Sequence, residues 1–221
     1  YNDPRLSRAF ITKQGTSGKE QAPGTADNAV YAPNGTPEQG TSKYGTSLFM
    51  YSISAPTLLL SYHELKFLEA EALCRLERDA KSALKDAVVA GLLNAENSFT
   101  ISRKELGKTL INAASSITEA EAESYFDNTI EAKYTAEPLK TTMTQKYFAL
   151  WGASGEATES YNDVRRMKGL GENFIELKNP NSFPLRCPYG NSDTTTNAEV
   201  KAAYGNGQYV YSENVWWAGG S

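Results

Sequence analysis

Histidine and cysteine are nearly absent from this chain, which limits the metal chemistry that it can carry. The 221 residues include one histidine, His63, and two widely separated cysteines, Cys74 and Cys187. A structural zinc site needs closely spaced Cys and His ligands, so the sequence predicts no metal site. The two cysteines form either one disulfide or two free thiols, and the sequence leaves both alternatives open.

The chain also lacks a strong charge excess, a long apolar run and the common catalytic motifs. Lys and Arg number 22 against 26 Asp and Glu, so the basic stripe typical of a nucleic-acid binder is not expected. No apolar run approaches the roughly 18 residues that a membrane-spanning helix needs. The GxSxG, P-loop and GxGxxG motifs are missing, and no cofactor is expected.

Carboxylates are numerous, but their distribution is typical of solvated helix faces. Most of them share predicted helices with Lys and Arg. A glycosidase needs two carboxylates at a set separation across a cleft, and the sequence singles out no such pair. Glu71, between Ala70 and Ala72, is expected to be partly buried and paired with an arginine in a structural role. The carboxylates therefore give no support for a carbohydrate-active enzyme, which stays an alternative.

The segment 12–57 has a composition unlike the rest of the chain. It is rich in Gly, Ser, Thr, Pro, Asn and Gln, from which neither a helix nor a central strand is readily built. Tyr31 and Tyr44 lie within it, and Phe49 and Tyr51 lie near its end. Because flexible linkers tend to lack aromatic residues, we expect an ordered loop draped over the rest of the protein.

Helical periodicity begins at Ser61. Apolar residues then recur at spacings of three and four, which predicts an amphipathic helix. The residues on its apolar face are Leu65, Leu68, Ala72 and Leu76. His63 lies in the first turn, where a lone histidine is more often a surface or capping residue than a catalyst.

Capping signals mark several helices. A Ser or Thr followed three residues later by Glu satisfies two free backbone N–H groups at a helix N-terminus. Such pairs are Ser61 with Glu64, Ser102 with Glu105, and Thr118 with Glu121. Pro138 suits the first turn of another helix, and the small Gly91 lets a neighbouring helix come close. Short loops favour antiparallel hairpins, so we predict a mainly α fold with long irregular loops and little β structure.

The stretch "QKYFALWGASGEATESYNDVRRMKG" combines aromatic residues with an arginine pair. We interpret it as two helical segments joined by a turn, with Trp151 packing against the body. Arg165 and Arg166 point about 100° apart on a helix, so they cannot clamp one anion together. One of them is expected to face a carboxylate such as Asp163, and the other to face outward.

Aromatic residues are the remaining source of binding chemistry. The chain has 13 Tyr and 3 Trp, many of them in irregular segments near Asn, Gln and Arg. Such a surface suits a sugar, because an aromatic ring packs on the apolar face of a pyranose while polar groups bind its hydroxyls. The alternative is that these rings anchor long loops to the helical body.

Several motifs stand in a fixed order along the chain: "SYHELKFLEAEALCRL" after "APTLLL", "TQKYFALWGASGEATESYNDVRR", "FPLRCPYGNSDTTTNAE", "NDPR" and the closing "VWW". Together they resemble the SusD/RagB family, and most closely its branch of starch-binding proteins that associate with the outer membrane. The residues that match are Tyr62, Glu64, Phe67, Leu68, Ala70, Glu71, Ala72, Gln145, Lys146, Glu156, Ala157, Asp163, Arg165, Arg166, Pro184, Arg186, Tyr189 and Asn197.

The resemblance implies a fold of tetratricopeptide-like helical hairpins. The chain would be one C-terminal region, 1–221, of a protein roughly twice as long. Within it we expect an irregular loop segment over 1–57, helical hairpins over 58–169 and an irregular C-terminal wrap over 170–221. A signal peptide, a lipidated cysteine and the first helix pairs would lie outside this chain.

The resemblance also implies a function. Such proteins are not enzymes; they are lipid-anchored at the outer membrane, face outward, and bind an oligosaccharide or other nutrient for a SusC-like TonB-dependent transporter. The membrane is contacted only through the lipid anchor, and no nucleic acid is involved. The alternative is a helical-repeat scaffold that binds a protein and no glycan.

The candidate ligand-binding residues lie in the Gly-rich loop. In the family, ligands usually meet aromatic residues on loops outside the helical scaffold. Tyr31 and Tyr44 are the aromatic candidates, and Asn34 and Gln39 are their expected hydrogen-bonding neighbours. Their choice follows from local composition, because none of the quoted motifs includes them.

Overall fold

The protein is seen here in a computed structural model. It describes residues 2–14, 20–23, 46–51, 53–106, 115–177, 183–207 and 209–220. The chain divides into two compact units, each of which is described by itself. The first comprises Tyr1–Ala32 and Glu38–Glu176, and the second comprises Pro33–Pro37 and Leu177–Ser221.

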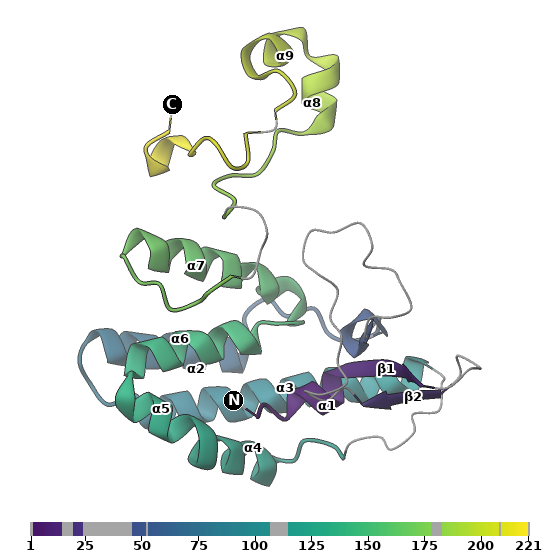
Figure 1. Cartoon of the computed structure of the whole chain (residues 1–221), viewed down its shortest axis with the longest axis vertical. Helices are drawn as coiled ribbons and strands as arrows, with labels where there is room; N and C mark the ends of the chain where they lie inside the picture. Colours follow the sequence, from purple (N-terminus) through teal and green to yellow (C-terminus); the bar gives the residue numbers. More distant parts are fainter. Residues whose placement is uncertain are drawn as a thin grey trace. The chain divides into compact units, whose positions relative to one another are not determined.

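The first unit is built mainly from helices (Figure 1). Its α-helices are α1 Arg5–Ala9, α2 Tyr62–Arg75, α3 Lys81–Leu106, α4 Glu119–Tyr125, α5 Glu131–Ala136, α6 Pro138–Ala149 and α7 Glu159–Gly169. Short helical turns are η2 Leu48–Tyr51, the π-helical η3 Phe126–Ile130 and η4 Ser154–Thr158. The prediction of a mainly α fold of tetratricopeptide-like helical hairpins with little β structure is confirmed.

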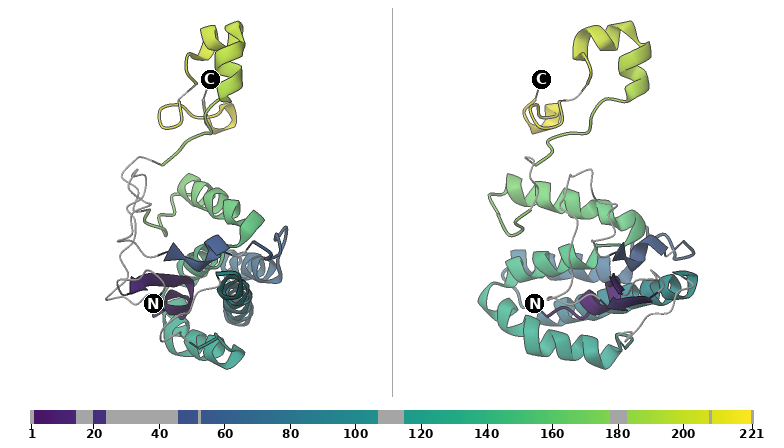
Figure 2. Two further views of the ribbon diagram at one scale, coloured as in Figure 1. Left: turned by 90° about the vertical axis from the view of Figure 1, so that its right-hand side faces the viewer. Right: turned by 45° about the vertical axis from the view of Figure 1, so that its right-hand side comes forward.

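Helices α2, α3 and α6 pack on one another and form the centre of this unit. Figures 1 and 2 show α7 on one side of these helices and the α4–α5 segment on the other. Phe67, Leu84 and Phe126 are fully buried in the shared core. A Cβ atom added to Gly91 would lie 3.1 Å from that of Ala149, so glycine lets α3 approach α6 as the sequence predicts.

The observed helix ends confirm only some of the predicted capping residues. Thr118 and Glu121 form the reciprocal capping box that opens α4. The Ser61 hydroxyl accepts a hydrogen bond from the Glu64 N–H at 3.1 Å, but the Ser61 N–H donates to Glu156. The predicted cap at Ser102 is wrong, because α3 continues past this residue and its hydroxyl donates to the Ser98 carbonyl. Tertiary burial of α3 outweighs this local capping preference.

The outer face of α2 carries the apolar residues that the periodicity selects. Leu65, Leu68 and Leu76 share one face, but they are 51%, 41% and 65% exposed. The buried face carries Phe67 and Ala70 together with charged residues. Apolar periodicity therefore identifies this helix correctly without identifying the side that packs against the core.

A small antiparallel sheet lies beside α1, within the segment expected to be irregular. Its strands are β1 Phe10–Gln14, β2 Glu20–Pro23 and β3 Thr46–Ser47, in the order β2-β1-β3. Ile11 pairs with Pro23 on one side and with Thr46 on the other. Phe10, the first residue of β1, directly follows the last residue of α1.

The second unit contains α8 Asn191–Thr196, α9 Ala198–Tyr204 and the short turn η5 Trp216–Ala218. The rings of Tyr189 and Tyr204 stack at 4.5 Å, and the Arg186 guanidinium lies 4.8 Å from the Tyr189 ring centre. This part of the chain therefore has helices where an irregular wrap was expected. Cys187 here and Cys74 in α2 are both free thiols in the structure.

No α-helix in the described ranges combines the length and the apolar composition needed to cross a bilayer.

Candidate functional site

The four residues predicted to bind ligand, Tyr31, Asn34, Gln39 and Tyr44, lie outside the described residues. Their assignment therefore stays a prediction. The described part of the chain contains a different candidate, an aromatic hollow formed by α1, the start of β1, the end of α6 and the turn into α7.

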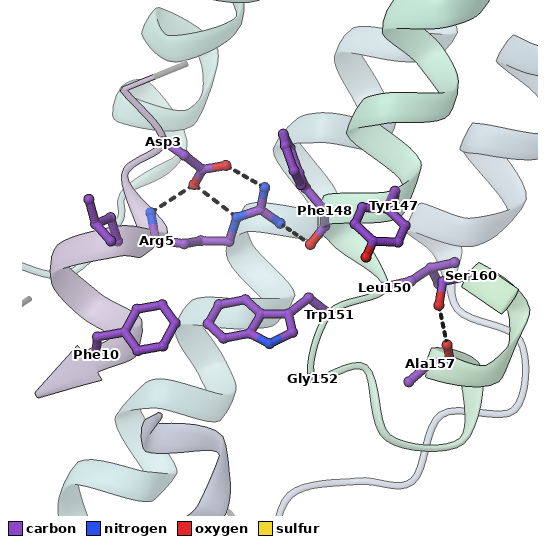
Figure 3. A pocket seen from close by; sticks show the side chains of 11 residues that line it. Asp3, Arg5, Phe10, Tyr147, Phe148, Leu150, Trp151, Gly152, Ala157 and Ser160 are labelled. Carbon is purple, nitrogen blue, oxygen red and sulfur yellow. Dashed lines mark hydrogen bonds and ion pairs between the residues drawn. The ribbon is translucent and has the colours of Figure 1, made fainter. Parts of the chain in front are cut away.

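The hollow has a volume of about 390 Å³ (Figure 3). Its lining residues are Asp3, Arg5, Leu6, Phe10, Tyr147, Phe148, Leu150, Trp151, Gly152, Ala157 and Ser160. Figure 3 shows Phe10 beside Trp151 in one part of the hollow, with Tyr147 and Ser160 across from them. Most of the lining is aromatic or aliphatic, and its polar groups are few, as in small-molecule sites generally.

Trp151 is held in place by two other aromatic rings. It stacks on Phe10 with centroids 5.1 Å apart and an interplanar angle of 18°. Phe49 meets it edge-on at 4.8 Å and 90°. The indole is fixed by these contacts, and Trp151 still remains 39% exposed. A rigid, partly exposed aromatic ring is the group that packs on the apolar face of a sugar or on another flat ligand.

Gly152 makes this arrangement possible. Its φ of +74° lies in the left-handed region that glycine adopts readily. A Cβ atom at this position would lie 2.4 Å from the Phe49 ring, well inside van der Waals contact. Glycine therefore lets the chain turn directly after Trp151 and leaves room for the Phe49 ring to contact the indole.

Arg5 forms a charged edge of the hollow and is 6% exposed. Its Nε donates to Asp3 Oδ1 at 2.9 Å, and its Nη1 donates to the Phe148 carbonyl at 2.7 Å. Burial acts to raise the pKa of Asp3, but the hydrogen bonds and positive charge of Arg5 hold it below its ordinary value. The guanidinium thus links the "NDPR" segment to the C-terminal end of α6, where positive charge is favoured.

Charged groups are few among the described residues that line the hollow. Among its described lining residues Asp3 carries the only carboxylate, and Arg5 holds it ionised. Glycoside hydrolysis requires a second carboxylate. No group of three or more Cys, His, Asp or Glu side chains in the described ranges is placed to hold a metal ion.

A second cluster of motif residues connects α2, α6 and α7. Arg166 donates to both carboxylate oxygens of Glu71, and Arg75 Nε donates to the same carboxylate at 2.7 Å. Lys146 Nζ, which is almost fully buried, lies 2.8 Å from Asp163. Burial acts to raise the pKa of Glu71, but its arginine partners lower it. The predicted structural pairing of Glu71 with an arginine is confirmed.

One arginine of the pair meets a carboxylate, as predicted, but the other is half-buried and does not face outward. Arg166 faces Glu71 and also bonds Asp163 at 2.8 Å, whereas Arg165 lies 5.5 Å from the Tyr161 ring centre. The cation–π geometry places Arg165 on a different side of α7. The two guanidinium groups therefore do not converge on one anion.

His63, expected to be a surface or capping residue, is 2% exposed. Its Nε2 lies 3.7 Å from an oxygen of Glu156, and Glu156 is itself 2% exposed. Burial lowers the pKa of His63, although the charge of Glu156 acts in the opposite direction. The side chain of His63 lies near Glu156 of η4 and Gly91 of α3, and no local signal in the sequence shows these contacts.

The fold and the hollow define a helical-hairpin protein with an aromatic pocket. No protein-family model matches the chain, and no curated protein sequence matches it. A solved structure of a SusD/RagB family protein from Bacteroides thetaiotaomicron VPI-5482 is 65% identical, with a TM-score of 0.88. The similarity covers 100% of this chain and 48% of that protein. The chain therefore belongs to the SusD/RagB family and spans about half the length of this relative.

Proposed function

We propose that this protein binds an oligosaccharide or a related nutrient at the outer-membrane surface and delivers it, without catalysis, to a partner TonB-dependent transporter. Membership of the SusD/RagB family is the observation that carries the proposal. The lipid anchor of this outward-facing protein would lie outside the given chain.

The aromatic hollow supports the proposal and offers a place where the ligand would bind. Trp151 offers a fixed aromatic ring, and Tyr147 and Ser160 bring hydroxyl groups to the same hollow. A pyranose needs both an apolar platform and hydrogen-bonding groups around it. We assign ligand contact to this hollow, and Tyr31, Tyr44, Asn34 and Gln39 remain a separate proposal for ligand-binding residues.

Glycan-array binding followed by calorimetric titration tests the assignment. Replacing Trp151 with alanine removes the platform, and we expect the affinity for the best array ligand to fall by about tenfold or more. Tyr62→Ala is the matched control, because Tyr62 is 60% exposed and does not line the hollow. Unchanged affinity in Trp151→Ala would exclude the hollow, and unchanged affinity in both Tyr31→Ala and Tyr44→Ala would exclude the loop.

A second candidate function is a scaffold that binds a protein and no glycan. The exposed leucines of α2 favour it, because a contiguous apolar face on a helix is a common protein-binding surface. Absence of any glycan bound on the array, with retained binding to the transporter partner, would favour the scaffold over the nutrient-binding function.

A further inference from the structure

Helix α1 borders two hollows of different chemistry. Arg5 and Leu6 line the aromatic hollow, whereas Ser7 and Arg8 line a second one of about 490 Å³. The segment before α4, α4 itself and η3 supply most of the remaining lining of this second hollow. No described residue lines both, so the two are separate places on the protein. The size of the second hollow is that of a small-molecule site.

Hydroxyl and amide groups dominate the lining of this second hollow, which we call the polar hollow. Ser7 comes from α1, Ser124 from α4, and Asn128 and Thr129 from η3. A hydroxyl or a side-chain amide can both donate and accept hydrogen bonds. The polar hollow therefore offers hydrogen bonding, where the aromatic hollow offers a ring for stacking.

The π-helical turn η3 brings two of these residues to the polar hollow. At its end the Glu131 N–H donates to the Phe126 carbonyl, five residues earlier. Phe126 and Ile130 are fully buried in the core, while Asn128 and Thr129 between them line the hollow. A π-helical turn next to α-helix is rare and is frequently found at functional sites.

The amide of Asn128 is held in one orientation. Its Nδ2 donates to the Ser124 carbonyl and to Ser124 Oγ, both at 2.9 Å. With Nδ2 engaged by α4, Oδ1 of Asn128 is the atom that can accept a hydrogen bond from a ligand. Ser124 Oγ accepts from the amide and can donate its own proton. A donor and an acceptor are therefore fixed side by side before any ligand binds, which lowers the cost of binding.

The charged groups of the polar hollow are already paired. Arg8, which is 4% exposed, donates through Nε to Glu96 of α3 at 2.7 Å. Glu96 also accepts from the Ile117 N–H at 3.1 Å, which links α3 to the segment before α4. Glu121 accepts from the Thr118 N–H at 2.9 Å in the capping box. The described lining thus favours a neutral, hydroxyl-rich ligand over an ion.

We propose that the polar hollow is a second binding site, which takes a neutral sugar or the end of an oligosaccharide through hydrogen bonds. The class of ligand rests on the proposed function, and the site rests on the geometry of α1, α4 and η3. Sugar hydroxyls donate and accept, as the lining groups do. Pro4 and Ala120 add apolar surface for the C–H groups of the ring.

Nuclear magnetic resonance of the isotope-labelled chain tests the second site. The probes are D-glucose, D-galactose, D-mannose and N-acetyl-D-glucosamine, each alone, and then the best array oligosaccharide. We expect saturable shifts of the amide resonances in 115–129, which line the polar hollow but not the aromatic one. Shifts with a monosaccharide identify a site for free sugar, and shifts with the oligosaccharide alone identify a site for a chain end. No saturable shift in 115–129 with any probe would overturn the proposal.

Alanine variants then assign the shifts to the lining groups. Ser7→Ala and Asn128→Ala each remove one polar group, and each should weaken binding of the probe about fivefold. Glu123→Ala is the matched control, since Glu123 is exposed on α4 and does not line the hollow. Unchanged affinity in both Ser7→Ala and Asn128→Ala would overturn the second site, and Ser7→Ala leaves η3 untouched. Loss of the shifts in Trp151→Ala would assign them to the aromatic hollow and also overturn it.

The uronic acid of the sugar that binds tests the preference for a neutral ligand. We expect it to bind about fivefold more weakly, because Arg8 is paired and the Glu121 carboxylate repels it. Equal or tighter binding would overturn this preference. Failure of every glycan to bind on the array would contradict the proposed function. Oligosaccharide shifts only around Trp151 would leave that function supported and exclude the second site.

Discussion

The two faces of α2 reverse the usual distribution of polar and apolar side chains. The face that packs against the other helices buries His63, Glu64 and Glu71 beside Phe67. The face that points outward exposes leucines. Packing against α3 and α6 buries this side of α2, and each ionisable residue buried there has a charged neighbour on α6, α7 or η4.

The largest expected effect comes from removing the apolar anchor of the inner face. Phe67 is fully buried, and Phe67→Ala should lower the free energy of unfolding by about 3–5 kcal/mol, because a large cavity remains. Urea denaturation followed by circular dichroism measures this change. Leu65→Ala on the outer face is the matched control and should change the free energy by no more than about 0.5 kcal/mol. Equal losses in the two variants would contradict the assignment of the faces.

A smaller effect is expected from the buried carboxylate of the inner face. Glu71→Ala leaves Arg75 and Arg166 without their shared partner, and we expect a loss of about 2 kcal/mol, reduced by the partial exposure of both arginines. Glu69→Ala removes an exposed carboxylate that pairs with Lys66 on the outer side, and should cost less than about 0.5 kcal/mol. Chemical denaturation of the two variants provides the comparison, and a similar cost for both would show that burial does not strengthen the Glu71 pair.

A third prediction is a dependence of stability on pH. The pKa of Glu64 is about 7 in the folded protein, above its ordinary value, so the folded state binds this proton more tightly than the unfolded chain does. The contribution is fully present below the unfolded pKa and is lost as pH rises to about 7, by roughly 1 kcal/mol per pH unit. Thermal and urea unfolding between about pH 5 and 8 should show this slope in the wild type relative to Glu64→Gln, and identical slopes would exclude Glu64 as the titrating group.

Local features of the fold were predictable from residues close in sequence. The capping box of Thr118 with Glu121 and the position of Pro138 at the start of α6 involve only neighbouring backbone groups. Gly91 was also interpreted correctly, because a glycine within an apolar helical stripe needs a close neighbour to explain it. The Ser102 signal failed because a capping pattern has little weight inside a long helix that packs against other elements.

The candidate site was predicted less completely. Trp151 was expected to pack, and it does so against Phe10 and Phe49, but the hollow beside it was not foreseen. The rings that form it come from residues far apart in the sequence, and no periodicity or motif spacing encodes such a contact. The pairing of Glu71 with an arginine was predicted because a glutamate between two alanines on a helix has few ways to be satisfied when buried.

The sequence by itself determined the helical class, several helix ends, the local role of Gly91 and the resemblance to the SusD/RagB family. These depend on backbone geometry and on motif order, which are properties of contiguous residues. Only the tertiary structure decided that the leucines of α2 face outward, that His63 and Glu156 are buried together, and that Trp151 borders a hollow. Each of these depends on which segments, far apart in the sequence, pack together. Burial and charge pairing arise from contacts between such segments.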